Sequence, residues 1–134
     1  MPSADVWDLY AEHGQLPRAS LTHAQQAVFA ICDLRQEVNS GGFDSYFRYG
    51  GDTAPVALAA LPEVLGQEWA DLLLKAMTIL GPAYPPGTDA RARVLDAQDR
   101  DHELSALDER FYDLEAATDA DARVDAHLRE DPGH

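Results

Sequence analysis

The sequence predicts an all-α fold: a single compact domain of six to eight helices, several of them short, around a central helix near residues 23–39. Three observations predict it. Apolar residues recur at spacings of three and four along several segments, which is the period of an amphipathic helix. β-branched residues are sparse and no run alternates with period two, so strands have little support. The 134 residues, 46% of them hydrophobic, are enough to bury one core, and we expect residues 1–134 to form one domain.

The first expected helix begins near Ser3, a residue type that caps helix N-termini, and runs to about His13. Leu9 and Tyr10 lie on its apolar side. Residues 1–20 therefore comprise an N-terminal helix and a linker.

The central helix has the strongest local support. Thr22 and Gln25 have the spacing of a capping box, in which each side chain bonds the other residue's backbone N–H, so the helix should begin just after Thr22. Core-facing residues then recur at spacings of three and four, at Val28, Ile31, Leu34, Arg35 and Val38. This stripe predicts that one face of the helix lies in the core.

Two adjacent glycines, Gly41 and Gly42, follow the central helix and predict a reversal, because glycine reaches positive φ without steric cost. The next helix should place Phe43, Tyr46 and Phe47 on one apolar face, at positions i, i+3 and i+4. That face must be covered by another part of the chain.

Glu37 is expected in the last turn of the central helix, which should end near Asn39, and a carboxylate there faces the negative end of the helix dipole. We expect the free N–H groups near Gly42 to Asp44 to hold this carboxylate. The alternative is that Glu37 and Asn39 contact a ligand.

Proline and glycine divide the middle of the chain. A reversal over residues 49–53 precedes Pro55, which suits the first turn of a helix, and Pro62 should end or kink that helix. An amphipathic core helix is expected over residues 68–80. Its apolar stripe comprises Trp69, Leu72, Leu73, Ala76, Met77 and Leu80. Three prolines within residues 81–87 predict an ordered surface loop.

The C-terminal third is strongly acidic, because residues 89–134 hold 14 acids and 6 arginines. Helices are expected over residues 91–96, 103–113 and 119–129, and residues 131–134 should fray. The inward-facing residues of the middle helix are Leu104, Leu107 and Phe111.

Acidic residues outnumber basic ones by 24 to 10, which leaves a formal net charge of −14. Direct binding to DNA or RNA needs a basic patch that releases counterions, so it is not expected, and an anionic membrane surface is disfavoured for the same reason. The favoured partner is a basic protein, above all one that itself binds nucleic acid. No segment has the pattern of a signal peptide or a membrane span, and the lone Cys32 fits a reducing compartment, so we expect a cytoplasmic protein.

No cluster of residues supports catalysis. Cys32 lies beside the apolar stripe and is expected to pack in the core, and the histidines are far apart in sequence. The segment 99–103 lacks both His-Glu-x-x-His spacing and the glycine of a calcium loop, so we interpret it as a solvated helix start. Gly50 and Gly51 are followed by Asp52, where a phosphate-binding loop has Lys. We predict no enzyme activity, no metal and no cofactor.

Acids three or four residues apart on a helix form a more specific pattern. Their Cβ atoms lie about 5–6 Å apart, close to the roughly 6–7 Å between successive phosphates of B-DNA. Such a surface would imitate a nucleic-acid backbone, whereas the alternative is an acidic surface that only confers solubility. The candidate phosphate mimics are Asp96, Asp99, Glu103, Glu109 and Asp113, continued by Asp121 and Asp125 on the next helix.

Two segments of the chain carry a family resemblance. Glu37-Val38-Asn39-Ser40-Gly41-Gly42-Phe43 followed by Tyr46-Phe47, and later Leu107-Asp108-Glu109-Arg110-Phe111-Tyr112, resemble two signatures of a bacterial, acidic, helical family that contains a DNA-mimic protein. Those signatures are E-x-N-x-G-G-F-x-Q-Y-F-x-N and L-D-x-x-F-Y, and the chain departs from the first at Ser45 and Tyr49. The resemblance spans about Leu21 to Tyr112. The motif positions are Glu37, Asn39, Gly41, Gly42, Phe43, Tyr46, Phe47, Asp108, Phe111 and Tyr112.

The resemblance implies an all-α architecture and, from the characterised member, a homodimer that mimics DNA and sequesters a helix-turn-helix transcription regulator. With the charge, it leads to our functional prediction of an acidic protein-binding module whose acidic face occupies the DNA-binding surface of a basic regulator. The alternative is a small-ligand or peptide-binding module with a pocket between Glu37, Asn39, Tyr46 and the Tyr84 loop. We interpret the motif turn itself mainly as a feature that holds the fold together.

Overall fold

The computed structural model describes residues 6–13, 16–97 and 101–130, and these residues form seven α-helices, two short 3-10 helices and no strand. The predicted all-α fold is therefore confirmed. The α-helices are α1 (Val6–His13), α2 (His23–Tyr49), α3 (Ala54–Val64), α4 (Gln67–Ile79), α5 (Thr88–Ala97), α6 (Asp101–Ala117) and α7 (Ala120–Glu130), and the 3-10 helices are η1 (Arg18–Ser20) and η2 (Gly51–Thr53). No helix among these residues is long and apolar enough to cross a membrane.

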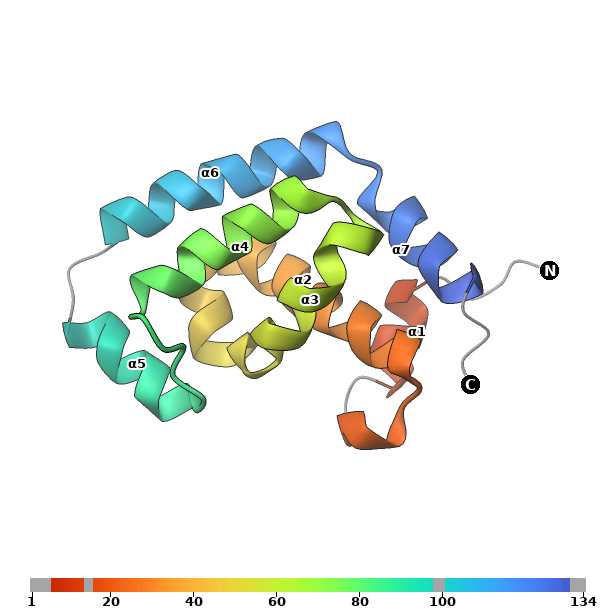
Figure 1. Cartoon of the computed structure of the whole chain (residues 1–134), viewed down its shortest axis with the longest axis horizontal. Helices are drawn as coiled ribbons and strands as arrows, with labels where there is room; N and C mark the ends of the chain where they lie inside the picture. Colours follow the sequence, from red (N-terminus) through yellow and green to blue (C-terminus); the bar gives the residue numbers. More distant parts are fainter. Residues whose placement is uncertain (1–5, 14–15, 98–100, 131–134) are drawn as a thin grey trace.

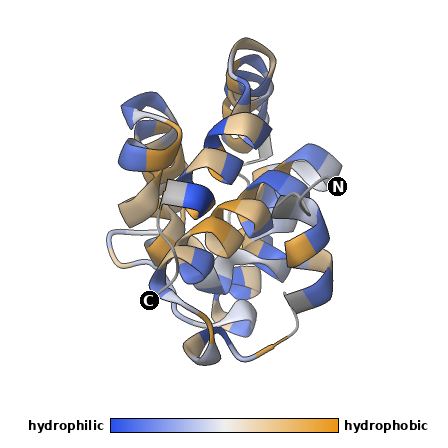
Figure 2. Ribbon diagram, turned by 90° about the vertical axis from the view of Figure 1, so that its right-hand side faces the viewer, coloured by the Kyte–Doolittle hydropathy of each residue, from blue (hydrophilic) through white to orange (hydrophobic). Residues whose placement is uncertain are grey.

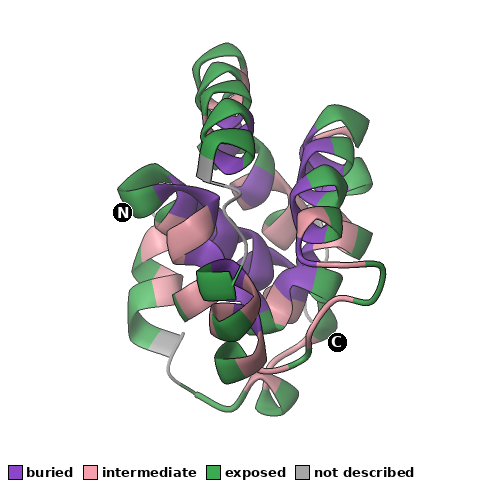
Figure 3. Cartoon of the chain, turned by 90° about the vertical axis from the view of Figure 1, so that its left-hand side faces the viewer, coloured by how far each residue is buried: buried purple, intermediate pink, exposed green. Residues whose placement is uncertain are grey.

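Helix α2 is the centre of the molecule, and all of α1, α3, α5, α6 and α7 contact it (Figure 1). Helices α4 and α6 run beside each other on one side, and α1 packs against α7. Most helices are hydrophobic on one side and hydrophilic on the other (Figure 2), and the buried positions face the interior (Figure 3). The predicted stripe of α2 is buried, including Val28, Ile31 and Val38, which are fully inaccessible to solvent. Burial of such a side chain contributes about 1.5–3 kcal/mol, so α2 supplies much of the core energy.

The N-terminus of α2 forms as predicted. The Thr22 hydroxyl accepts the Gln25 backbone N–H at 3.1 Å, and the Gln25 side-chain oxygen accepts the Thr22 N–H at the same distance. The capping box is thereby confirmed. Ser3 and residues 131–134, for which we predicted a cap and fraying, lie outside the described residues.

The glycine kink, defined as Gly41 and Gly42, divides α2 into two helical segments. Gly41 has φ −149° and ψ 15°, and Gly42 has φ 81° and ψ −178°, so neither is helical, and the helix resumes at Phe43. Helical segments lie on both sides of the two glycines as predicted, but a kink within one element joins them where we expected a reversal. It redirects the chain within one long element and places Phe43, Tyr46 and Phe47 in the core, all fully buried.

Pro62 does not end its helix, which corrects one of the two expected outcomes. Helix α3 begins at Ala54 with Pro55 in its first turn, as predicted, and continues through Pro62 to Val64. Pro62 lacks the N–H that would donate to the Leu58 carbonyl, and the helix tolerates the loss of this one bond two residues before its end. The carbonyl of Leu61 accepts the N–H groups of both Leu65 and Gly66, at 2.9 and 2.8 Å, and so closes the helix end.

The later elements match the expected core but not every boundary. All six residues of the predicted α4 stripe are buried, as are Leu104, Leu107 and Phe111 of α6. Helices α5 and α6 extend beyond the predicted ranges at both ends. The loop over residues 81–87 is fixed by hydrogen bonds, because the Tyr84 hydroxyl donates to the Gly51 carbonyl at 2.6 Å and Arg91 donates to the Pro85 carbonyl at 3.1 Å.

Arg91 is a fully buried cation that sequence reasoning did not identify. Its guanidinium donates to the Phe47 carbonyl at 2.8 Å and pairs with Asp52 at 2.5 Å, and it lies over the Tyr84 ring. These bonds join α5 and the 81–87 loop to the end of α2. A buried charge is tolerated only when it is paired and hydrogen-bonded in this way.

Candidate protein-binding surface

The two motif segments meet at the glycine kink. The Asp108 carboxylate, on α6, accepts the backbone N–H of Phe43 at 2.8 Å, across 65 residues of sequence. Gly42 allows this approach, since a Cβ at that position would strike the carboxylate and stand 2.9 Å from its Cγ. The φ of 81° at Gly42 also favours glycine. The first helical N–H after the kink is thus satisfied by a distant side chain.

The other residues of the later segment contact the same place. The Tyr112 hydroxyl donates to the Val38 carbonyl at 3.2 Å, in the turn of α2 just before the kink. The Phe111 ring packs edge-on against Phe43, with centroids 5.8 Å apart, and edge-on against Trp69 of α4 at 5.3 Å. Asp108, Phe111 and Tyr112 follow the i, i+3, i+4 spacing that presents one helical face. They therefore dock α6 onto the kink of α2.

The prediction that Glu37 is held by N–H groups near residues 42–44 is wrong, because Asp108 accepts the Phe43 N–H and Glu37 instead accepts the Ser45 hydroxyl at 3.0 Å. The local sequence indicates Glu37 as the acceptor, whereas the fold brings the Asp108 carboxylate from α6. Desolvation raises the pKa of Asp108 above its ordinary 3.8, the Phe43 N–H opposes that rise, and nearby Asp44 adds to it.

The residues proposed for a ligand pocket at the motif do not line one common pocket. Tyr46 is fully buried, the Asn39 side chain donates to Glu115 at 3.2 Å, and Tyr84 bonds the Gly51 carbonyl. Only Glu37 of this set lines a cleft that we call the Tyr49 cleft, of about 450 Å³ between α1, η1 and α2. Its other lining side chains include Trp7, Tyr10, Arg18, Asp33 and Tyr49.

A partly buried ion-pair network around Arg35 holds α1, α6 and α7 on α2. Arg35 donates to both carboxylate oxygens of Glu115 at 2.8 and 2.9 Å and to Asp121 at 2.8 Å, and it lies over the Trp7 ring. The Trp7 indole N–H also donates to Asp121, at 2.9 Å. Arg35 and Trp7 lower the pKa of Asp121 below 3.8. The helical period predicted that Arg35 lies on the core face of α2, but it did not predict that Glu115 and Asp121 pair with it.

The first part of the predicted row of carboxylates is distributed over two helices. Asp96 lies on α5 and Glu103 on α6, and the link between them falls on residues 98–100, outside the described residues. Asp99 lies outside the described residues. Asp96 remains 70% exposed but pairs with Arg48 at 3.0 Å, while Glu103 is exposed in the first turn of α6.

Two of the predicted acids do share one exposed face, and we call Glu109 and Asp113 the acidic face of α6. They lie four residues apart, and among the described residues neither forms an ion pair. Asp121 and Asp125, by contrast, pair with Arg35 and with Arg129. The sequence of α6 contains six acids and one arginine, so this helix contributes strongly to the negative surface.

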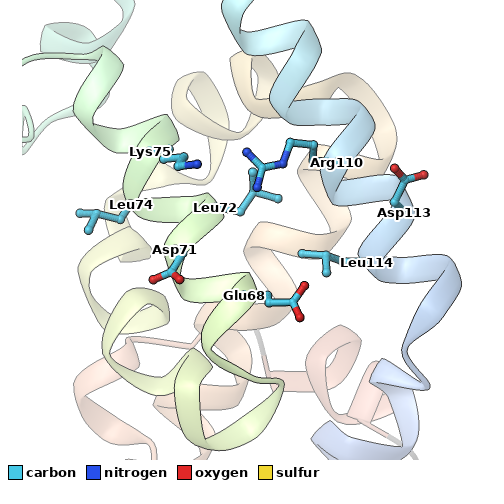
Figure 4. A pocket seen from close by; sticks show the side chains of 8 residues that line it. All are labelled: Glu68, Asp71, Leu72, Leu74, Lys75, Arg110, Asp113 and Leu114. Carbon is cyan, nitrogen blue, oxygen red and sulfur yellow. The ribbon is translucent and has the colours of Figure 1, made fainter.

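A groove of about 470 Å³ lies between α4 and α6 beside this face (Figure 4). Lys75 and Arg110 project toward each other across it, above Leu72, and Leu114 forms part of its apolar floor. Its acidic residues are Glu68 and Asp71 of α4 and Asp113 of α6. The groove is therefore mixed in charge, with two cations set into an acidic surrounding.

The fold and this surface define an acidic, all-α protein whose long α6 docks on a kinked central helix. A family model described as DMP19-like protein matches residues 19–131, and the chain belongs to that family. The family expected from the two motif segments is thus confirmed. It is not a known family of enzymes. Searches of curated proteins and of solved structures found no match.

Proposed function

We propose that this protein is an acidic protein-binding module that mimics DNA and sequesters a basic DNA-binding protein, such as a helix-turn-helix regulator. Membership of the DMP19-like family, a family of DNA mimics, supports the class of function. The net charge of −14 supports a cationic partner, because opposite charge accelerates encounter and favours complementary surfaces.

The observation that carries the proposal is the acidic face of α6. Five arginines (Arg18, Arg35, Arg48, Arg91 and Arg129) are bound to acids within the protein. Glu109 and Asp113 are exposed and have no such partner among the described residues, so their charges remain available. Their spacing of four residues places the Cβ atoms about 5–6 Å apart, which approaches the spacing of phosphates along a strand.

Helix α4 adds carboxylates across the groove. Glu68 and Asp71 lie on one side and Asp113 on the other, so acids flank a depression, as phosphates flank a DNA groove. Lys75 and Arg110 oppose the imitation locally, and their replacement by glutamine should strengthen binding to a basic partner. Asp96, Asp99 and Glu103 remain predicted contacts beyond this face. The proposal also includes a homodimer, which light scattering on the purified protein would test.

The test is a paired comparison of charge-neutral variants. Glu109→Gln/Asp113→Asn removes the acidic face, and Glu63→Gln/Asp89→Asn removes two exposed charges elsewhere as a matched control. Binding to a panel of purified basic regulators is measured over a salt series, with their operator DNA as competitor. The loss of two exposed ion pairs costs roughly 0.4–2 kcal/mol, a weakening of about 2- to 30-fold.

Two results support the proposal together: the acidic-face variant binds more weakly than the control, and the wild-type protein displaces DNA from the regulator. Equal weakening of both variants would show that net charge alone drives association. DNA mimicry would be contradicted if no basic regulator in the panel both binds the protein in a salt-sensitive way and releases its DNA on binding.

A further inference from the structure

The Tyr49 cleft contains one carboxylate whose charge is already satisfied. Arg18 donates to both oxygens of Asp33, at 3.0 and 3.1 Å, Thr53 donates at 2.7 Å, and the Tyr10 hydroxyl donates as well. Asp33 is buried, and three different side chains supply its hydrogen bonds. It therefore belongs to the wall of the cleft, and a ligand would find no free charge there.

Glu37 is the second carboxylate of the cleft, and its charge is not compensated. Its one hydrogen bond comes from the neutral Ser45 hydroxyl, and among the described residues it forms no ion pair. It lies in the last turn before the glycine kink, where the dipole of the preceding helical segment adds negative potential. Both effects favour a cation at this carboxylate. Gly50 faces it, and a Cβ there would stand 3.2 Å from the Glu37 Cγ, so the absence of a side chain keeps this space open.

Aromatic rings line the same cleft. Tyr49 is 75% exposed, the most exposed large hydrophobic side chain among the described residues, and no core contact accounts for its position. Trp7 and Tyr10 also line the cleft and pack edge-on with centroids 5.8 Å apart. Guanidinium groups already stack on rings around this cleft, since Arg35 lies 5.3 Å from the centre of Trp7 and Arg18 lies 5.8 Å from that of Phe29.

A free carboxylate beside an exposed aromatic ring is the arrangement that recognises a guanidinium. The group is planar, donates two parallel hydrogen bonds to a carboxylate, and stacks on aromatic faces with a weaker hydration cost than an ammonium. We propose that the Tyr49 cleft binds a guanidinium group, with Glu37 as its counter-ion and the Tyr49 ring as its stacking surface. The group would come from a small molecule of the arginine type or from an arginine side chain of another protein. The site is separate from the acidic face of α6.

The probe is N-acetyl-arginine amide, titrated into the ¹⁵N-labelled protein at 150 mM NaCl so that diffuse attraction to the acidic surface is screened. We expect saturable shifts at the backbone amides of Glu37, Tyr49 and Gly50. N-acetyl-citrulline amide, which has the same shape without the charge, should produce none of these shifts. Glu37→Gln keeps the Ser45 hydrogen bond and should weaken binding roughly tenfold or more, because a charge-assisted pair is lost.

Matched variants make the assignment specific. Tyr49→Ala should weaken binding while Tyr49→Phe preserves it, and Glu63→Gln, an exposed neutralisation outside the cleft, should have no effect. The Glu109→Gln/Asp113→Asn variant should bind the probe like the wild type, so failure of this site and failure of DNA mimicry are distinguishable. Tighter binding of a Gly/Ser peptide with one arginine than of the probe would assign the source to a protein side chain, and equal affinity would assign it to a small molecule.

Three results would overturn the proposal. The first is chemical shifts that do not saturate, and the second is binding of the citrulline compound as tight as that of the arginine compound. The third is an equal loss of affinity for the probe in Glu37→Gln and Glu63→Gln. Circular dichroism of each variant establishes that a loss of binding is not a loss of fold.

Discussion

Replacement of Asp108 by alanine tests whether the docking of α6 on the glycine kink stabilises the fold. The substitution removes the acceptor of the Phe43 N–H, and Phe43 is fully buried. A buried donor left without its partner costs about 1–3 kcal/mol. For a chain of this length, 1 kcal/mol corresponds to a change of about 3–5 °C in Tm, so we expect Tm to fall by roughly 3–15 °C.

Asp108→Asn separates the hydrogen bond from the charge. Its side-chain oxygen can still accept the Phe43 N–H, so at neutral pH this variant should retain most of the stability that Asp108→Ala loses. Desolvation raises the pKa of Asp108 in the folded protein above 3.8, so protonation favours the folded state. That contribution is present below 3.8 and is lost as the pH rises through the folded-state pKa. The wild type should therefore gain stability relative to Asp108→Asn as the pH is lowered toward 3.8.

Thermal unfolding followed by circular dichroism and urea midpoints at about pH 7 and pH 4 would measure both effects. Unfolding of Asp108→Ala at the wild-type temperature, or equal destabilisation of the asparagine and alanine variants, would contradict a stabilising role for the hydrogen bond between Asp108 and the Phe43 N–H. A wild-type advantage over Asp108→Asn that shrinks on acidification would show that the sign of the pKa shift is wrong.

Two further predictions concern the same framework. Gly42→Ala should destabilise the protein more than Gly66→Ala. Both glycines have positive φ, of 81° and 131°, and backbone strain at such a position costs about 1–3 kcal/mol. Only at Gly42 would the added Cβ also meet a carboxylate. Urea denaturation measures this difference in stability between the two glycine variants. The difference should vanish when both variants are made in the Asp108→Ala background, and a difference that remains would show that the clash is not with Asp108. Asp121→Asn should be less stable than the wild type above pH 5, and this difference should disappear as the pH falls below about 4. Arg35 and Trp7 lower the pKa of Asp121 in the folded protein, so the stability that the Asp121 carboxylate contributes is lost when it is protonated. A pH-independent deficit in the urea midpoint would contradict this.

Local patterns predicted the elements of this protein because their causes are local. The capping box of Thr22 and Gln25 and the stripe that includes Val28 and Leu34 depend on residues within a few turns of one helix. The boundaries were less accurate where the cause was not local. Pro62 stayed inside α3 because the helix was already close to its end.

The candidate site was predicted in part, for the same reason. Glu109 and Asp113 share a face because both lie on α6, and their spacing alone predicts it. The row through Asp96 and Asp99 assumed one continuous helix. Asp96 lies on α5 and Glu103 on α6, and the pair that Asp96 forms with Arg48 comes from packing, which spacing does not encode.

The sequence by itself determined the helical class, the core face of α2, the glycine interruption and the excess of negative charge. Only the tertiary structure decided which carboxylate accepts a hydrogen bond from which donor. Asp108 rather than Glu37 accepts the Phe43 N–H, and Glu37 lines the Tyr49 cleft without an ion pair to any described residue. The physical reason is that helix periodicity follows from neighbouring residues, whereas an ion pair or a hydrogen bond depends on which side chains the packed helices bring within about 3 Å of each other.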